Sequence, residues 1–555
     1  MTIDNQTQFS VAPSGLSRRA EGPAVDYAVA AVSLAVFAVW IFVFRFRNVL
    51  EEYDLYAVLS GLLDGVDSGK RLASPLQYGA SFGFGYIAAV YWFVNDRVLR
   101  DPDLLIPLMN QIGSWAAIIG AACFWLSTRL LYGVRVATIA LILFVLSPMM
   151  LQLGTSGHQI LLAFALFAAG SVFLFLQTRG GTAVACEVAG CVLLLIAMTV
   201  RAEIFLALPY VVLARADFRS VRRFLNSAFV RCIGPALAFV LFFLMKHFLV
   251  DRAAPTPLPS SGFFDAFYSF SNIPKGAVVM FFGCGGATLL LGLVAAFRAY
   301  RTGAAGAKAA ERREGFGRFT SLVGPVAMFL PPFAFWIANP VPTRHFILCL
   351  SAIAILIGQW LASWRRGPAM AYGLAAAAVL ANQGIASTAG PVALKFYPSP
   401  YFPVAGVPRI VPRVLVSTSW AHRRDILNER ERVDRVANEL RNTCDQKVAL
   451  FTAWSRPIFV RLYAGGQQVE GQLTDLNGFP VASGKVGGRE FAIISTPEGW
   501  PRDAVAEVLQ NSAYDSYKLM FERDTMSEYE KTPIPADRAV RMGCQAPLSP
   551  EAGRP

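Results

Sequence analysis

The sequence predicts an α-helical polytopic membrane protein with a C-terminal extracytoplasmic α/β domain. Of its 555 residues, 55% are hydrophobic and only 16% are charged, and apolar runs of spanning length recur through the first 390 positions. A soluble domain carries about 25% charged residues, so this chain has too few charges to cover its surface in water. Composition also excludes a disordered chain, a collagen and a coiled coil.

The net charge of +13 lies almost entirely in the apolar part of the chain. Residues 391–555 hold 21 basic and 19 acidic residues, whereas residues 1–390 hold 29 and 18. Basic residues between membrane spans set topology, because positively charged loops stay in the cytoplasm. The charge therefore indicates orientation and not a nucleic-acid partner.

We expect about eleven spans. The first, Tyr27 to Phe44, is a retained signal anchor, because no small-residue cleavage site follows it. Two shorter runs, 183–199 and 202–214, are separated by a polar break. The other runs of spanning length are 104–127, 136–152, 159–178, 232–250, 276–298, 319–338, 345–363 and 369–388.

One aromatic and glycine-rich run, 78–94, decides the orientation. If this run does not span the membrane, the cytoplasmic segments hold 18 of the 29 basic residues. If it does span, every later loop moves to the other side of the membrane and most of these residues would have to be translocated, which insertion disfavours. We therefore interpret it as an interfacial or re-entrant helix. The N-terminus is then cytoplasmic and the C-terminus extracytoplasmic.

Four segments follow from this topology. Residues 1–26 form a cytoplasmic N-terminal segment, and residues 27–388 form the transmembrane part. Residues 389–415 form a proline-rich linker, and residues 416–555 form the outer domain. In that domain we expect helices at 425–441 and 504–509 and strands at 448–453 and 491–495.

Two of the eight cysteines, Cys444 and Cys544, lie in this polar tail. In an extracytoplasmic setting they can form a disulfide, and two free thiols are the equal alternative. Signatures of soluble enzymes are missing from the sequence: it has no phosphate-binding GxxxxGK[ST], no HExxH, no CxxC and only four dispersed histidines.

Acidic residues cluster just after the first span, at Glu51, Glu52 and Asp54. Carboxylates at the bilayer surface can supply a general base or a cation ligand to a lipid-linked substrate. The alternative is an ordinary solvated loop.

Further polar residues fall at the outer ends of spans. They are His158, Arg201, Glu203, Arg344 and His345. Ionisable groups at membrane depth are costly and often functional, and arginine suits phosphate. The alternatives are snorkelling side chains or a structural ion pair such as Arg201 with Glu203. Because one orientation places them all on the outer face, we expect them to line a cavity there.

In order along the chain, these motifs resemble the type C (GT-C) superfamily of polyprenyl-phosphate-sugar-dependent membrane glycosyltransferases. The resemblance covers roughly residues 27–388. The matching motifs are Glu51-Glu52 with Tyr56, Leu62-Leu63-Asp64-Gly65, Pro75-Leu76, Ser147-Pro148, Arg201-Ala202-Glu203, and Arg344-His345 where the family often has Arg-Tyr. Two departures are an acidic pair that begins with Glu51 and a histidine, His158, where many members have an acid.

The resemblance implies an inverting transfer of a hexosyl or pentosyl group. Asp54 or Glu51, beside Glu52, would deprotonate the acceptor hydroxyl. Arg344, Arg201, Lys70 or Arg71 would neutralise the departing phosphate. His158, Glu203 and His345 would line the cavity. The metal remains unknown, since the pattern is compatible with a divalent cation but does not require one.

The resemblance implies a multi-pass protein of the cell inner membrane. Its expected partners are a polyprenyl-phosphate sugar donor, membrane lipid and an acceptor. The acceptor is unknown and can be a glycan, a lipid or a protein. No nucleic acid is involved. A transporter or flippase for a lipid-linked glycan is the alternative, although transporters favour internal repeats and charge near mid-membrane. A non-catalytic assembly or sensor protein is the third.

Overall fold

The structure is a computed structural model. It describes the helical part of the chain nearly throughout and only the strands of the tail. The described residues are 24–47, 83–176, 180–217, 220–251, 272–309, 314–338, 343–364, 367–388, 392–395, 413–416, 447–453, 481–486, 489–496, 518–521 and 539–540.

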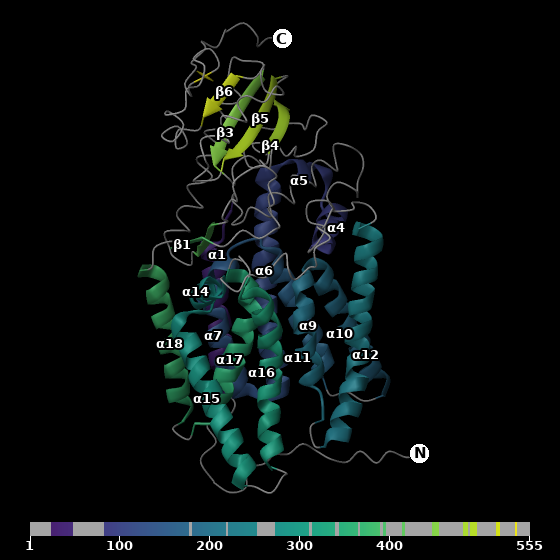
Figure 1. Cartoon of the computed structure of the whole chain (residues 1–555), viewed down its shortest axis with the longest axis vertical. Helices are drawn as coiled ribbons and strands as arrows, with labels where there is room; N and C mark the ends of the chain where they lie inside the picture. The colour runs from purple at the N-terminus through teal and green to yellow at the C-terminus, as the bar shows by residue number, and fades with distance from the viewer. Residues whose placement is uncertain are drawn as a thin grey trace.

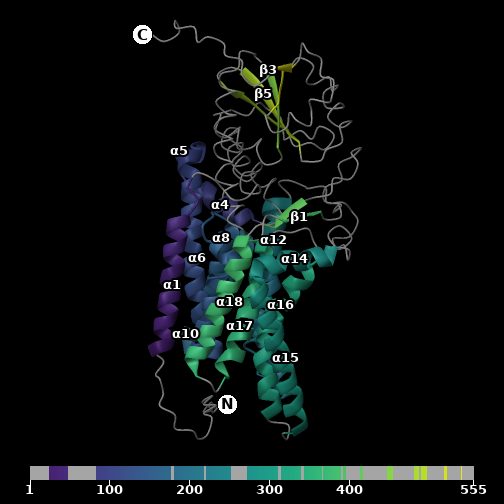
Figure 2. The ribbon, with the colours of Figure 1, turned by 90° about the vertical axis from the view of Figure 1, so that its left-hand side faces the viewer.

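The helices run mostly along one axis and form a bundle (Figures 1 and 2). In chain order they are α1 (Ala24–Phe44), α4 (Phe84–Phe93), α5 (Asp96–Arg100), α6 (Pro102–Tyr132), α7 (Val134–Val145), α8 (Pro148–Leu153), α9 (Gln159–Phe175), α10 (Gly180–Val200), the 3₁₀ helix η1 (Ala202–Ala207), α11 (Leu208–Leu213), α12 (Val221–Lys246), the π-helical turn η2 (His247–Asp251), α14 (Ile273–Cys284), α15 (Gly286–Ala309), α16 (Glu314–Trp336), the 3₁₀ helix η4 (Thr343–Phe346), α17 (Ile347–Ala362) and α18 (Pro368–Thr388).

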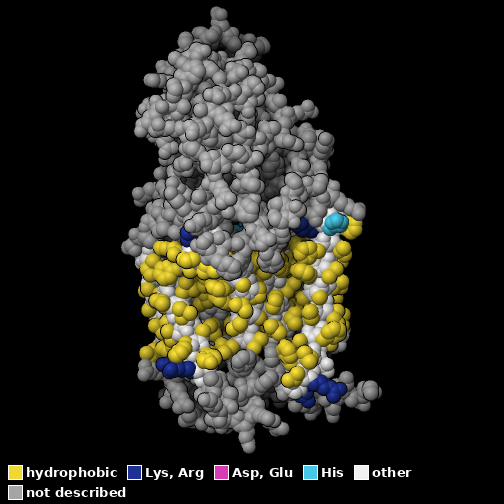
Figure 3. All heavy atoms as spheres, in the orientation of Figure 1, with side chains coloured by type: hydrophobic (Ala, Val, Ile, Leu, Met, Phe, Trp, Pro, Cys, Tyr) yellow, Lys and Arg dark blue, Asp and Glu magenta, His cyan; other side chains and the backbone are white. Residues whose placement is uncertain are grey.

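The protein is a multi-pass membrane protein. Among the described residues, six helices are long and apolar enough to cross a bilayer, or seven if one bent pair is a single span. Four shorter apolar helices, of 10–17 residues, overlap other predicted spans. Figure 3 shows a continuous apolar band with Lys and Arg at both edges. The total of eleven spans therefore stays a prediction.

The ambiguous run 78–94 contributes α4, which has ten residues. A helix of that length is about 15 Å long, half of what the hydrocarbon core requires. A Cβ added at Gly85 would lie 2.3 Å from Thr199 Oγ1 near the end of α10. The close approach of α4 to α10 thus depends on glycine, and the helix is too short to span.

The predicted span at 276–298 is not one straight helix. The chain bends by 102° between α14 and α15. Gly285 at the bend has φ +88°, a conformation that only glycine adopts without strain. From α18, the Asn382 side chain accepts a hydrogen bond from Ala287 N at 2.9 Å and donates one to Thr288 Oγ1 at 2.7 Å. The first of these contacts satisfies a backbone N–H at the start of α15 that has no partner within the helix.

A polar contact joins the first and last long helices. Asp26, buried near the start of α1, accepts a hydrogen bond from the Tyr372 hydroxyl on α18. Arg135 on α7 places its Nε 3.7 Å from Asp26 Oδ1. On the same helix, Thr138 Oγ1 donates to the Asp26 carbonyl at 3.1 Å. Three helices from distant parts of the sequence therefore meet at one carboxylate.

The described tail consists of strands. The antiparallel pair β1 (Val392–Lys395) and β2 (Arg413–Val416) precedes a five-stranded mixed sheet of order β4-β5-β3-β6-β7. Its strands are β3 (Lys447–Ala453), β4 (Val481–Val486), β5 (Arg489–Thr496), β6 (Lys518–Phe521) and β7 (Ala539–Val540). The strands expected at 448–453 and 491–495 are β3 and β5, parallel neighbours. The helices expected at 425–441 and 504–509 lie outside the described residues.

We predict that Gly285→Ala lowers the free energy of unfolding by about 1–2 kcal/mol, the strain of a left-handed alanine. Its Cβ would also lie 2.4 Å from Asn382 Cγ, so that side chain must move. The measurement is the thermal unfolding midpoint of the detergent-purified protein.

The matched control is Gly373→Ala. Gly373 lies within α18, where an added Cβ meets nothing within 4 Å. Alanine there should leave the midpoint unchanged or raise it, because alanine is the better helix former. Equal midpoints for the two variants would show that the bend does not depend on Gly285.

Candidate functional site

The candidate site forms where two helical segments are interrupted. After α10, Arg201 is extended, with φ −152° and ψ 108°, and the 3₁₀ helix η1 follows it. Near the end of α10, the Thr199 hydroxyl donates to Ile196 O at 2.8 Å, while Arg201 N still bonds Ala197 O at 2.9 Å. The second interruption is η4, directly before α17. Irregular backbone at membrane depth is tolerated where protein buries it.

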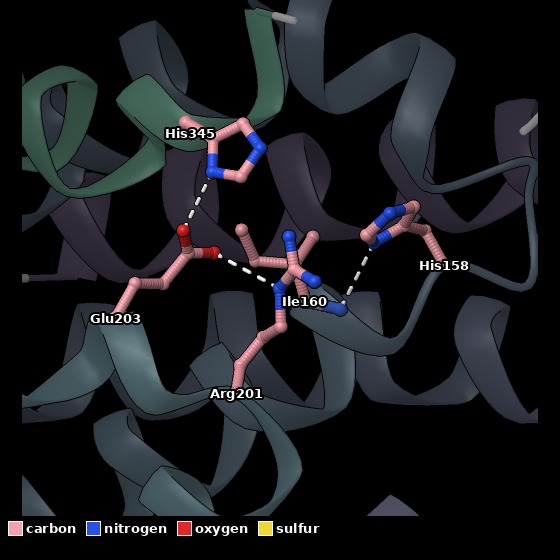
Figure 4. Close-up of polar contacts among 5 residues, drawn as sticks. All are labelled: His158, Ile160, Arg201, Glu203 and His345. Carbon is pink, nitrogen blue, oxygen red and sulfur yellow. Dashed lines mark hydrogen bonds and ion pairs between the residues drawn. The ribbon is translucent and has the colours of Figure 1, made fainter. Parts of the chain in front are cut away.

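Glu203 connects these two interruptions (Figure 4). Its Oε1 accepts a hydrogen bond from Arg201 Nε at 3.3 Å, and its Oε2 lies 2.6 Å from His345 Nδ1. All three residues are buried, with 7–8% of their surface exposed. A carboxylate beside a guanidinium is ionised and only accepts hydrogen bonds, so His345 Nδ1 is the donor.

The contact with Glu203 fixes how Arg201 points. Glu203 engages Arg201 through Nε, and in Figure 4 the dashed contact between the two side chains runs to Nε. No hydrogen bond from the two terminal nitrogens of the guanidinium occurs within the described part of the chain. Glu203 thus orients Arg201 through Nε alone.

His345 is held on a second side by an aromatic ring. The centroid of its imidazole lies 4.4 Å from that of Trp336, with the rings tilted by 46°. Arg344 precedes it in the same 3₁₀ turn and is 5% exposed. Two arginines, one on each interrupted segment, are therefore buried around a single carboxylate among the described residues.

His158 begins α9 and acts as its cap. Its Nδ1 accepts a hydrogen bond from Ile160 N at 3.1 Å, and its side chain is fully buried. Since Nδ1 accepts, a neutral His158 carries its proton on Nε2. In Figure 4 the Arg201 guanidinium lies between Glu203 and His158, so four predicted cavity residues come from one region.

The chain that leaves the first span runs beside the loop leading to His158. Phe46 N donates to Thr155 O at 2.9 Å, and Trp40 Nε1 donates to Leu151 O at 3.2 Å. The described residues of this segment end at Arg47, four positions before Glu51. The predicted acids Glu51, Glu52 and Asp54, the bases Lys70 and Arg71, and the cysteines Cys444 and Cys544 lie outside the described residues.

The sequence indicated some of these contacts and missed others. The pairing of Arg201 with Glu203 follows from their spacing, and the structure contains it. The contact of Glu203 with His345 joins residues 142 positions apart, which no local pattern indicates. Within the described ranges, no group of three or more His, Cys, Asp or Glu side chains is placed to hold a metal ion.

No protein-family model matches the chain. No curated protein matches its sequence either.

Solved structures do match the fold. ArnT from Cupriavidus metallidurans bound to undecaprenyl phosphate matches with a TM-score of 0.48 and 10% identity, over 80% of this chain and 85% of that one. The apo oligosaccharyltransferase of Archaeoglobus fulgidus matches with a TM-score of 0.44 and 14% identity, over 79% and 64%. The oligosaccharyltransferase AglB from the same organism, in complex with an inhibitory peptide and a dolichol-phosphate, gives 0.43 and 13%, over 80% and 64%.

Both kinds of protein belong to the superfamily that the sequence resembles. The chain spans less than two thirds of the oligosaccharyltransferase. At these identities and TM-scores below 0.5 the likeness is too distant to assign an activity, which has to be argued from the residues of the site.

We predict that Glu203→Ala lowers the free energy of unfolding by about 3–5 kcal/mol, because it leaves a buried arginine without its counter-charge. Combining it with Arg201→Ala should cost less than the sum of the single changes, by about 0.5–3 kcal/mol. Denaturant unfolding followed by tryptophan fluorescence measures all three variants.

Arg97→Ala supplies the control pair, because Arg97 is exposed on α5. In the double variant, the changes in the free energy of unfolding caused by Arg97→Ala and Glu203→Ala should be additive. If the Arg201 and Glu203 changes are also additive, the ion pair does not stabilise the protein.

Proposed function

We propose that the protein is a membrane glycosyltransferase that moves a sugar from a polyprenyl-phosphate donor to an extracytoplasmic acceptor with inversion. One observation supports this most directly: the buried guanidinium of Arg201 donates to its carboxylate partner through Nε and not through its terminal nitrogens. Paired N–H donors of this kind match the oxygens of a phosphate.

The charges around this site favour an anionic ligand. Arg201 and Arg344 bring two guanidiniums to the site, and Glu203 is the acid in contact with Arg201 and His345 among the described residues. Burying charge is costly, and a ligand phosphate would offset that cost. In our proposal Arg201 and Arg344 contact the donor phosphate, and Lys70 and Arg71 assist.

The position of the site suits a lipid-linked substrate. Arg201 follows one membrane helix and Arg344 precedes another, so both lie at the ends of spans. A polyprenyl chain can then remain among the helices while its phosphate and sugar reach the arginines. In the proposed orientation this end of the bundle faces outward from the cell inner membrane, together with the tail.

The proposed reaction is a single displacement at the anomeric carbon. Asp54 or Glu51, with Glu52 beside them, takes the proton of the acceptor hydroxyl. The acceptor oxygen then bonds to the anomeric carbon as the carbon–oxygen bond to phosphate breaks. The electron pair of that bond stays on the phosphate, whose added charge Arg201 and Arg344 stabilise. Glu203, His345 and His158 shape the cavity around it.

We expect Arg201→Gln to reduce transfer at least about 100-fold, the usual effect of removing a donor that stabilises a developing charge. Transfer is measured as sugar release from radiolabelled polyprenyl-phosphate donor by the purified protein. Binding of undecaprenyl phosphate should weaken in parallel.

Arg97→Gln is the matched control, because it removes an exposed arginine from α5 and should leave transfer unchanged. Normal transfer and lipid binding by folded Arg201→Gln would contradict the proposed phosphate contact. Failure of the wild-type protein to release sugar would contradict the transferase itself and favour a transporter or a non-catalytic protein.

We expect Asp54→Asn or Glu51→Gln to abolish transfer while leaving binding of undecaprenyl phosphate intact, because the base acts on the acceptor and not on the phosphate. Single-turnover assays at saturating donor separate the two effects. Full activity in both single variants would refute the assignment of the base.

A further inference from the structure

A second charged cluster lies lower on α10. Glu187 on this helix accepts hydrogen bonds from both terminal nitrogens of Arg215, which follows α11. Nη1 donates to Oε1 at 3.1 Å, and Nη2 donates to Oε2. The Arg215 side chain is 6% exposed. A buried, two-pronged contact of this kind neutralises the carboxylate and fixes its position.

Arg231 of α12 adds a second positive charge to this pair. Its Nη1 lies 3.9 Å from Glu187 Oε2, and 48% of its side chain is exposed. Since Arg215 already engages both oxygens of Glu187, the three residues carry one net positive charge. The exposed part of that charge belongs to Arg231.

The surface around Arg231 is apolar and exposed. Four large apolar side chains near it on α12 are more than half exposed: Phe229, Val230, Ile233 and Leu237. The span Val221–Leu249 has the smallest buried share of the six candidate spans, 17%. Arginine on such a face needs an anionic partner or water.

Arg231 lies ten residues after the first residue of α12, in the half of the helix nearer its basic N-terminal end. The span Val221–Leu249 has 29 residues and is about 44 Å long, more than the 30 Å hydrocarbon core, so part of it projects beyond the core. Figure 3 shows Lys and Arg side chains at the lower edge of that band beneath α12. Glu187 precedes Arg201 by 14 residues, about 20 Å along α10, so this cluster is separate from the candidate site.

We propose that Arg231, with Arg215 and Glu187, binds the phosphate of an anionic phospholipid in the leaflet opposite the candidate site. The acyl chains of the lipid would pack on the exposed apolar face of α12. A headgroup of charge −1 balances the cluster, whereas a zwitterionic lipid would bring a cation toward two guanidiniums. Basic pockets between membrane helices bind anionic lipids in this way.

Native mass spectrometry of the full-length protein in detergent tests the proposal, with dioleoyl phosphatidylglycerol and dioleoyl phosphatidylcholine as probes. Wild-type protein should bind phosphatidylglycerol about fivefold more tightly than phosphatidylcholine. Arg231→Gln should remove that preference, since one arginine near an anionic lipid contributes about a factor of five. Arg222→Gln, at an exposed arginine nine positions earlier on α12, should keep it.

Three outcomes would overturn the proposal. They are equal binding of the two lipids by wild-type protein, an unchanged preference in Arg231→Gln, and displacement of the bound lipid by millimolar inorganic phosphate. The comparison of lipids on wild-type protein requires no variant, so it remains decisive even if Arg231→Gln does not fold.

Discussion

A single buried carboxylate, that of Glu203, organises the candidate site of this protein. It joins a turn that follows α10 to a turn that precedes α17, and it orients an arginine in doing so. Neither turn is regular helix, so its backbone would be costly to expose to lipid. The contact brings the two interruptions together inside the bundle. The orientation of Arg201 is therefore a consequence of how the helices pack.

Much of the fold could be predicted because a membrane helix is identified by a continuous apolar run of local sequence. Apolar length alone located most of the spans, and strand propensity located β3 and β5. The bend between α14 and α15 was missed, because Gly285 and Asn382 are 97 positions apart and hydropathy does not register a side-chain cap. Several helices are also shorter than a bilayer, so their number does not give the number of spans.

The candidate site was predicted unevenly for the same reason. Arg201 and Glu203 are two positions apart and pair as their spacing suggests, and the shared orientation of the span ends anticipated that His158 and His345 would lie in this region. Which atom of Glu203 contacts which partner depends on tertiary packing, and so does the direction of the guanidinium. The acidic residues Glu51, Glu52 and Asp54 were singled out by their scarcity, and their role still rests on sequence.

The contact between Asp26 and Tyr372 has a consequence for biosynthesis. The two residues are 346 positions apart, so the carboxylate on the first helix enters the membrane long before its hydroxyl partner exists. At about 5–20 residues per second, translation needs about 20–70 s to supply that partner. Throughout this interval Asp26 must be stabilised by water at the membrane surface or by Arg135 on α7. Helix α1 therefore completes its contacts only after α18 has been made.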